Sequence, residues 1–200
     1  MAETVMRVAR SELILGGQKS GKSRRAESLA AAWLARSPAE GPDHRAVLIA
    51  TASAHDDEMR ERIARHQRER GQRVPGMMTV EAVHELPAAI AQAGGTETLR
   101  VVDCLTLWLT ALLMPATDAG QAPAAADWPV HAAALVQAIA ACPGPIVLVG
   151  NEIGLGVIPL GRELRAFVDA LGTLNQQVAA ACERVTLMAA GLPLTLKGQP

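Results

Sequence analysis

The sequence has few aromatic residues and almost no net charge. Among its 200 residues there is no tyrosine, one phenylalanine and three tryptophans. So few rings leave little to form the base-stacking surfaces used by proteins that bind single-stranded nucleic acid. Nineteen lysines and arginines against twenty aspartates and glutamates give a formal net charge of -1, so no overall field draws the chain to nucleic acid or to an anionic membrane. We expect neither partner.

Paired cysteines and long apolar runs are also missing. Cys104, Cys142 and Cys182 are widely spaced and form no CxxC motif, which predicts reduced thiols in the core rather than metal or redox chemistry. No uncharged apolar run reaches the roughly 18 residues of a membrane span, and the N-terminal stretch lacks the apolar region of a signal peptide. We therefore expect a cytoplasmic protein.

The composition that is present is typical of one folded domain. Half of the residues are hydrophobic and 20% are charged, unlike the apolar-poor composition of disordered chains. We expect residues 1–200 to form a single domain, with residues 1–11 as an N-terminal extension. The Ala-, Gly- and Pro-rich segment 115–129 shows little periodicity and is expected to be a loop between helices.

Short apolar runs alternate with helical stretches along the chain. Most of the runs are continuous, as in strands that are buried on both faces. Strands followed by helices predict an α/β fold, with a mostly parallel β-sheet covered by helices on both faces. The expected strands are 12–15, 46–51, 77–81, 99–103, 145–150 and 184–189, and the clearest helices are 22–36, 56–71 and 162–183. In the last helix an apolar stripe should face the sheet: Leu164, Phe167, Leu171, Leu174 and Val178.

A P-loop is the most informative motif. The octapeptide GGQKSGKS at 16–23 matches G-x-x-x-x-G-K-[ST] and lies between an expected strand and an expected helix, as its mechanism requires. Backbone N–H groups of such a loop point inward and, with the helix dipole, cradle phosphate. We expect Lys22 to reach the β- and γ-phosphates and the Ser23 hydroxyl to ligate Mg²⁺. The predicted phosphate-binding residues are Gly16, Gly17, Gln18, Lys19, Ser20, Gly21, Lys22 and Ser23.

The P-loop and the alternation of strands with helices favour a P-loop NTPase of the RecA-like type. Asp103 ends the run LRVVD. It could hold Mg²⁺ through water, as a Walker-B carboxylate does, or it could cap the helix that begins near Leu105. The sequence leaves both roles open.

An arginine-rich helix carries one distinctive histidine. Within HDDEMRERIARHQRERGQR, His66 follows Met59 and Ile63 on one helical face, and Arg62 and Arg70 lie four residues to either side of it. One interpretation is a solvated helix with internal ion pairs. The other is that the arginines grip a polyphosphate while His66 attacks it, because neighbouring positive charge favours the neutral, nucleophilic ring.

Several further motifs occur in a fixed order along nearly the whole chain. GGQKSGKSRRAE is followed by IAT and DDEMRERIARHQRER, then by TVE at 79–81, VDCLTLWL at 102–109 and NEIGLGVIP at 151–159, and LRAFVDALGTLNQQVA and AAGLPLTLKG come last. Together they resemble the bifunctional adenosylcobinamide kinase/adenosylcobinamide-phosphate guanylyltransferases of cobalamin biosynthesis. This combination is far more specific than any one of the motifs.

The resemblance implies two reactions. The enzyme phosphorylates the aminopropanol hydroxyl of adenosylcobinamide with GTP or ATP, and then transfers GMP from GTP to that phosphate through a guanylyl-histidine. It assigns the nucleophile to His66. The P-loop motif, and not the resemblance, gives Lys22 its catalytic role and makes Ser23 and Asp103 the candidate ligands of Mg²⁺. The resemblance also implies a homo-oligomer such as a homotrimer. Beyond the P-loop, it implies nucleotide contacts by Ala50, Thr51, Ala52, Gln67, Arg68, Glu69, Arg70, Glu81 and Asp103.

Two features depart from the family pattern, and two other functions compete with it. The extension 1–11 is longer than the usual start, and Thr173 stands where an arginine is common. One alternative is a P-loop kinase for another small alcohol, in which the histidine helix is only structural. The other is a GTP-dependent switch protein, which the absence of an N-K-x-D motif disfavours.

Overall fold

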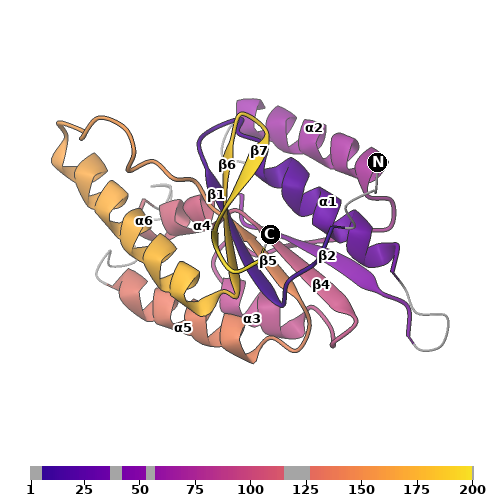
Figure 1. The fold of residues 1–200 in the computed structure, drawn as a ribbon. Coiled ribbons are helices and arrows are strands. Elements are labelled where there is room, and N and C mark those ends of the chain that lie inside the picture. The colour runs from indigo at the N-terminus through magenta and orange to yellow at the C-terminus, as the bar shows by residue number, and fades with distance from the viewer. Residues whose placement is uncertain (1–5, 37–41, 53–56, 115–126, 200) are drawn as a thin grey trace.

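One seven-stranded sheet organises the molecule. The computed structural model describes residues 6–36, 42–52, 57–114 and 127–199, without the side chains of residues 58, 59 and 62 (Figure 1). The strand order is β3-β2-β4-β5-β1-β6-β7, and only the β6–β7 pair is antiparallel. The strands are β1 (Ser11–Gly16), β2 (Arg45–Ala50), β3 (Met78–Glu81), β4 (Thr98–Asp103), β5 (Ile146–Val149), β6 (Arg184–Ala189) and β7 (Leu192–Lys197).

Helices cover both faces of this sheet. Helices α1 and α2 lie on one face and the remaining four on the other (Figure 1). None of the helices in the described ranges is long and apolar enough to cross a membrane. Their bounds are α1 (Lys22–Leu34), α2 (Asp57–Arg73), α3 (Leu86–Gln92), α4 (Leu105–Leu113), α5 (Trp128–Ala141) and α6 (Arg162–Ala181).

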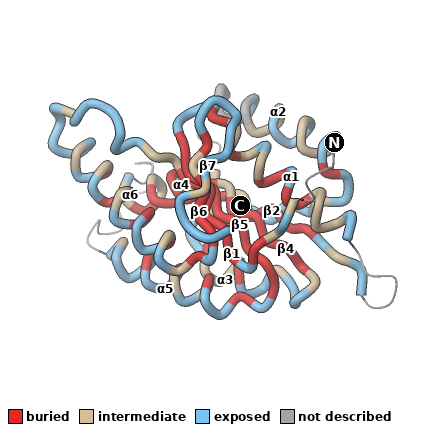
Figure 2. Tube along the Cα trace, in the orientation of Figure 1, coloured by how far each residue is buried: buried red, intermediate tan, exposed pale blue. Residues whose placement is uncertain are grey.

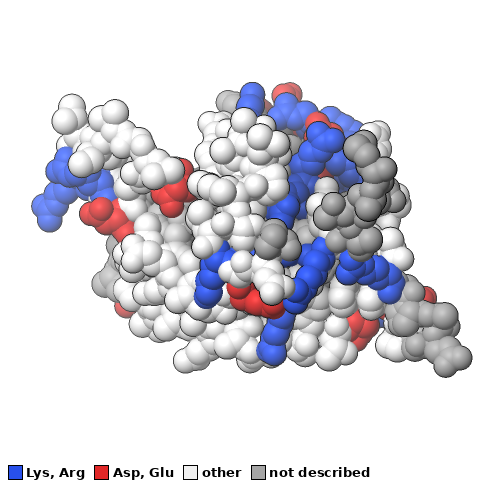
Figure 3. Space-filling view, viewed as in Figure 1, with Lys and Arg blue, Asp and Glu red and all other residues white. Residues whose placement is uncertain are grey.

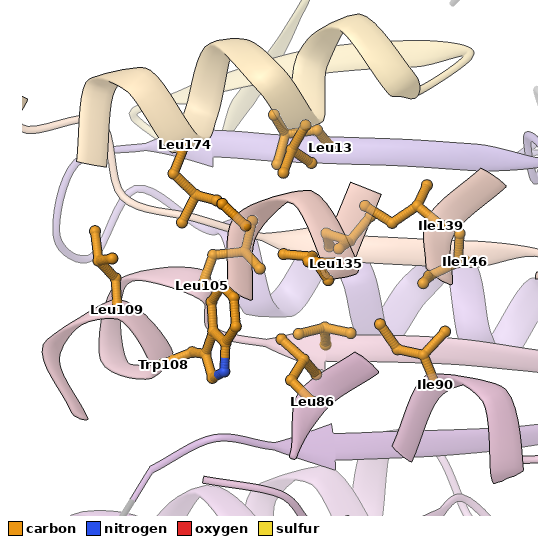
Figure 4. Close-up of a cluster of buried hydrophobic side chains, with 14 of the residues drawn as sticks. Leu13, Leu86, Ile90, Leu105, Trp108, Leu109, Leu135, Ile139, Ile146 and Leu174 are labelled. Atoms are coloured by element: carbon orange, nitrogen blue, oxygen red, sulfur yellow. The ribbon is translucent and has the colours of Figure 1, made fainter. Parts of the chain in front are cut away.

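The sheet separates two apolar cores, because successive side chains of a strand point to opposite faces. Leu13 packs with α3 to α6, whereas its neighbour Ile14 packs with α1. In the larger core Trp108 is fully buried among leucines and isoleucines from four helices and the sheet (Figure 4). Buried segments therefore run through the middle of the molecule and exposed ones around it (Figure 2).

The predicted α/β fold is confirmed, and all six expected strands are present. Strand 184–189 matches to the residue. The seventh strand, β7, was not expected, and β3 does not have the buried character expected of it. Met78 and Val80 are 54% and 44% exposed, because β3 is an edge strand.

The expected apolar stripe of α6 is correct for four of its five residues. Phe167, Leu171, Leu174 and Val178 are buried in the larger core, but Leu164 is 51% exposed. Leu164 lies in the first turn of the helix, where the main core does not cover it.

The prediction that residues 115–129 form a loop is wrong at the C-terminal end of this range. Residues 115–126 lie outside the described ranges, but Trp128 and Pro129 already belong to α5. Proline suits the first turn of a helix, since its missing N–H would have no helical partner there. The prediction of reduced, buried cysteines is confirmed: all three are free, and burial raises the pKa of Cys104 to about 11 and that of Cys182 to about 12.

Candidate nucleotide site

The P-loop connects the buried strand β1 to α1 through backbone conformations that favour glycine. Gly21 has φ 100° and Gly16 has φ 152°. A Cβ atom at Gly16 would lie 2.5 Å from the carbonyl oxygen of Met188, and one at Gly21 would lie 3.3 Å from Cα of Gly191. Any larger residue would therefore push the loop away from β6 and the turn that follows it.

Lys22 is held inside the loop. The residue is only 8% exposed, and its Nζ donates a hydrogen bond to the carbonyl oxygen of Gly17 at 2.6 Å. Burial lowers the pKa of Lys22, while the nearby Cys104 and Asp103 act in the opposite direction. The Lys22 ammonium is thus enclosed by the loop, and the negative charge of Asp103 stabilises its protonated form.

The ends of β2 and β4 are joined beside this lysine. The Thr51 hydroxyl donates to the carbonyl oxygen of Cys104 at 2.7 Å and accepts from its N–H at 2.8 Å. The Thr51 N–H also donates to the carbonyl oxygen of Asp103 at 3.2 Å. The Thr51 side chain is therefore occupied within the protein, and it fixes the strand end that carries Asp103.

Two segments that sequence reasoning did not assign to the site form the other wall of the P-loop. The N–H of Glu152 donates to Gly16 O at 3.1 Å, and the N–H of Gly191 donates to Ser20 O at 3.0 Å. Between these segments and the loop is a hollow of about 410 Å³. Its lining residues are Gly17, Gln18, Lys19, Ser20, Glu152, Leu155, Leu187, Met188, Ala189 and Ala190.

Helix α2 carries His66 and the predicted nucleotide contacts Gln67 to Arg70, and it is mostly exposed. Ile63 and Arg70 are partly buried and Val74, just after the helix, is buried. These positions share one face of the helix, and His66 falls on that face between Ile63 and Arg70. His66 itself is exposed, as are Gln67 and Arg68. The inward face of α2 thus has an uncovered position at the histidine.

Two described contacts tie the end of α2 to the rest of the protein. Arg73 Nη1 donates to Glu27 Oε2 of α1 at 2.8 Å, and Arg70 Nη2 donates to Thr79 Oγ1 of β3 at 3.4 Å. Lysine and arginine side chains gather over α2 and beside α1, whereas the tip of the β6–β7 hairpin carries none (Figure 3). A basic surface therefore borders the face of the sheet that α1 covers.

The predicted residues fall into two groups. The P-loop residues, Thr51 and Asp103 meet at the carboxyl ends of the parallel strands, where ligands bind in folds of this kind. Gln67 to Arg70 lie on α2. Ala50 and Glu81 are the last residues of β2 and β3 and are paired in register, so they are neighbours at the carboxyl ends of the strands.

The middle of helix α6, at residues 173–177, contacts the segment that forms the opposite wall of the site. The Asn175 side chain is buried and its Nδ2 donates to the carbonyl oxygen of Asn151 at 3.1 Å. Thr173, where the resemblance leads one to expect arginine, is exposed, and its hydroxyl donates back to Asp169 O at 2.9 Å. Asn175 rather than Thr173 therefore contacts the segment that begins at Asn151.

A family model described as cobinamide kinase / cobinamide phosphate guanyltransferase matches residues 12–196. The chain belongs to this family. It is 44% identical over 193 residues to the bifunctional adenosylcobalamin biosynthesis protein CobP of Pseudomonas aeruginosa, covering 94% of this chain and 98% of that protein. It is also 33% identical over 194 residues to the bifunctional adenosylcobalamin biosynthesis protein CobU of Escherichia coli, covering 92% and 98%.

A solved structure supports the fold. The flagellar accessory protein FlaH from Methanocaldococcus jannaschii aligns with a TM-score of 0.51 at 11% identity, covering 97% of this chain and 80% of that one. At this identity the likeness concerns the fold alone. Together with the P-loop motif and the sheet order, this likeness supports a RecA-like P-loop fold.

Proposed function

We propose that this protein phosphorylates the aminopropanol hydroxyl of adenosylcobinamide and then transfers GMP from GTP to the resulting phosphate. The observation that carries the proposal is the P-loop lysine, buried and hydrogen-bonded to Gly17 O, in a chain that belongs to the cobinamide kinase family. A P-loop alone specifies a nucleotide, and membership of the family specifies the corrinoid acceptor.

For phosphoryl transfer the proposal assigns the P-loop residues to the nucleotide. The inward N–H groups and Lys22 would neutralise the β- and γ-phosphates. The Ser23 hydroxyl and the Asp103 carboxylate are hard oxygen donors near Lys22, and such donors suit Mg²⁺. The metal, when bound, neutralises charge on the phosphates. The acceptor hydroxyl oxygen attacks the γ-phosphorus directly, the bond to the β-phosphate oxygen breaks, and the nucleoside diphosphate leaves while the hydroxyl proton is released to solvent. This step therefore needs no protein nucleophile.

For guanylyl transfer the proposal assigns His66 as the nucleophile. An imidazole nitrogen attacks the α-phosphorus of GTP, a nitrogen–phosphorus bond forms, the bond to the β-phosphate oxygen breaks, and pyrophosphate leaves. An oxygen of the corrinoid phosphate then attacks the same phosphorus, the nitrogen–phosphorus bond breaks, and the histidine is released. Adenosylcobinamide-GDP results.

The register of the two neighbouring helices supports this role. Because β1, β2 and β3 are parallel, the intervening helices α1 and α2 run in the same direction (Figure 1). Arg73 of α2 pairs with Glu27 of α1. Seven residues before Arg73 is His66, and seven before Glu27 is Ser20 in the P-loop. Along α2, His66 is about 10 Å before Arg73, and along α1 the helix start that follows the loop lies before Glu27 in the same direction. This register supports a position of His66 toward the P-loop end of α1.

Other predicted contacts are proposed around this pair of centres. Arg68 and Arg70 supply positive charge close to His66 for a polyphosphate, and Gln67, Glu69, Glu81, Ala50 and Ala52 complete the nucleotide surroundings. GTP or ATP as phosphoryl donor, the cytoplasmic location and a homo-oligomer such as a trimer stay predictions.

The test uses GTP labelled separately at the α- and γ-phosphates, with and without adenosylcobinamide. We expect γ-label to pass to the corrinoid, and α-label to form an adduct with the protein that survives alkali and decays in acid, because protonation makes imidazole a good leaving group. His66→Ala should lose the adduct and keep γ-label transfer. Since His84 is also exposed, His84→Ala serves as the matched control and should keep both.

Two results would contradict the proposal. An adduct that formed equally well without His66 would remove the histidine mechanism. Transfer of γ-label to another alcohol, with none to the corrinoid, would leave a P-loop kinase of different specificity.

A further inference from the structure

An ion pair that lies outside the P-loop joins the two helices of the proposed site. Glu27 is only 9% exposed, on the face of α1 that packs toward the sheet and α2. Its Oε2 accepts from Arg73 Nη1 at 2.8 Å, and the other terminal nitrogen of Arg73 donates to Glu69 Oε2 at 2.8 Å. One guanidinium thus connects α1 with two positions on α2.

The burial of Glu27 makes this pair different from the other described ion pairs of α2. An exposed ion pair contributes little, because water and salt screen it. Arg60 and Asp57 form such a pair, with side chains that are 57% and 93% exposed. A carboxylate that is largely withdrawn from water must instead find a cation, because an unpaired buried charge is costly. The Glu27–Arg73 contact therefore constrains the position of α2 more strongly.

The position of Arg73 on α2 gives this constraint a direction. Arg73 lies seven residues after His66, so the two side chains leave the helix on nearly the same face. Holding Arg73 against α1 therefore turns the His66 face toward α1 and the loop that precedes it. No described side chain of α2 within 57–73 is fully buried, so few other contacts set this rotation.

We infer that the Glu27–Arg73 pair is a positioning element for guanylyl transfer, which holds α2 at the rotation and register that bring His66 to the nucleotide in the P-loop. This inference rests on the proposed function. Neither residue touches the reacting atoms. Phosphoryl transfer by direct attack needs no nucleophile from α2, so the exact placement of His66 by this pair matters for guanylyl transfer and much less for phosphoryl transfer.

The test compares the two half-reactions in Glu27→Gln, Arg73→Gln and the double variant, using α- and γ-labelled GTP. Each single variant should form the adduct about ten- to a hundredfold more slowly, because a shift of about 1 Å in a reacting group costs about a hundredfold. Transfer of γ-label should stay within about twofold. The double variant should be no slower than the slower single variant, since both changes break the same contact. Arg73→Lys, which keeps the charge, should recover part of the rate.

Arg60→Gln is the matched control, because it removes an exposed ion pair from the same helix and should leave both rates unchanged. Equal losses of α- and γ-label transfer would show general damage to the fold and overturn the inference, as would additive losses in the double variant. If the parent protein forms the adduct and the single variants form it at the parental rate, only the positioning role fails. If the parent forms no adduct, the proposed histidine mechanism fails, and the positioning role fails with it.

Discussion

The P-loop and α2 differ in how the rest of the protein holds them. The P-loop begins on β1, a fully buried strand with parallel partners on both sides, and its backbone is bonded to the turn after β6 and to the segment after β5. Helix α2 has an exposed His66 and is attached chiefly near its end, where Val74 is buried and Arg73 meets Glu27.

This difference suits the two chemistries that the protein is proposed to perform. A phosphate cradle works through oriented N–H groups, so it must be rigid before the nucleotide arrives. The proposed nucleophile, His66, attacks the nucleotide bound in the P-loop and then passes a nucleotidyl group to a bulky corrinoid. It therefore needs access from solvent. The structure supplies a rigid loop and an accessible histidine on separate elements.

The largest effect is expected from removing the buried charge of Glu12, a residue of β1, the strand that leads into the P-loop. Glu12 is fully buried and accepts from Arg184 Nε at 2.8 Å, Arg25 Nε at 3.2 Å and Thr186 Oγ1 at 2.7 Å. Glu12→Gln should lower the free energy of unfolding by about 3 kcal/mol, because two arginines lose their buried counter-charge. Chemical denaturation measures this change.

The same measurement on α2 sharpens the comparison. Asp57→Asn, at a side chain that is 93% exposed, should leave the unfolding midpoint unchanged, since exposed ion pairs contribute little. Equal effects of the two substitutions would contradict the contrast between a rigid strand and a loosely held helix.

The next largest effect is expected at the lysine of the cradle. Lys22→Ala should weaken GTP binding by about a hundredfold or more, because the nest would lose the cation that neutralises the β- and γ-phosphates. Calorimetric titration measures the affinity, and Lys19→Ala, at an exposed position on the loop, should have a smaller effect. Near-parental affinity in a folded Lys22→Ala protein would remove the loop from the proposed site.

A smaller effect is expected at the proposed metal ligand. Ser23→Ala should raise the Mg²⁺ concentration needed for half-maximal γ-label transfer by about tenfold while retaining GTP binding, because it removes a ligand of the metal and no counter-charge of the phosphates. A Mg²⁺ titration of the initial rate measures this change. An unchanged titration curve would assign the metal to other residues.

Much of the fold could be predicted from local signals in the sequence. Continuous apolar runs revealed the buried parallel strands, and the P-loop fixed which strand carries the phosphate site. The edges of the sheet were harder to predict. Strand β3 was predicted but not its exposure, and β7 was missed, because the side chains of both edge strands follow no burial pattern. Leu192, Leu194 and Leu196 alternate along β7, yet all three are more than half exposed, so their hydrophobicity did not indicate a core.

The residue pattern alone specified the P-loop and made Asp103 a candidate, whereas Thr51 came only from the family resemblance and the opposite wall was not predicted at all. The motif specified residues 16–23, but the wall opposite comes from Glu152 and Gly191, which reach the loop through backbone hydrogen bonds. Such contacts depend on backbone geometry and leave little trace in residue type. The Glu27–Arg73 pair was missed for another reason: a periodic pattern shows which charges share a helix, but not which ones meet across two helices.

The place of β1 in the sheet has a consequence for how the protein folds. The P-loop follows β1 directly, yet both neighbours of β1 are β5 and β6, which lie far along the sequence at 146–149 and 184–189. The turn that closes over Ser20 includes the equally distant Gly191. The phosphate cradle therefore depends on contacts between segments that are far apart in the sequence, and such contacts are expected to form late in folding.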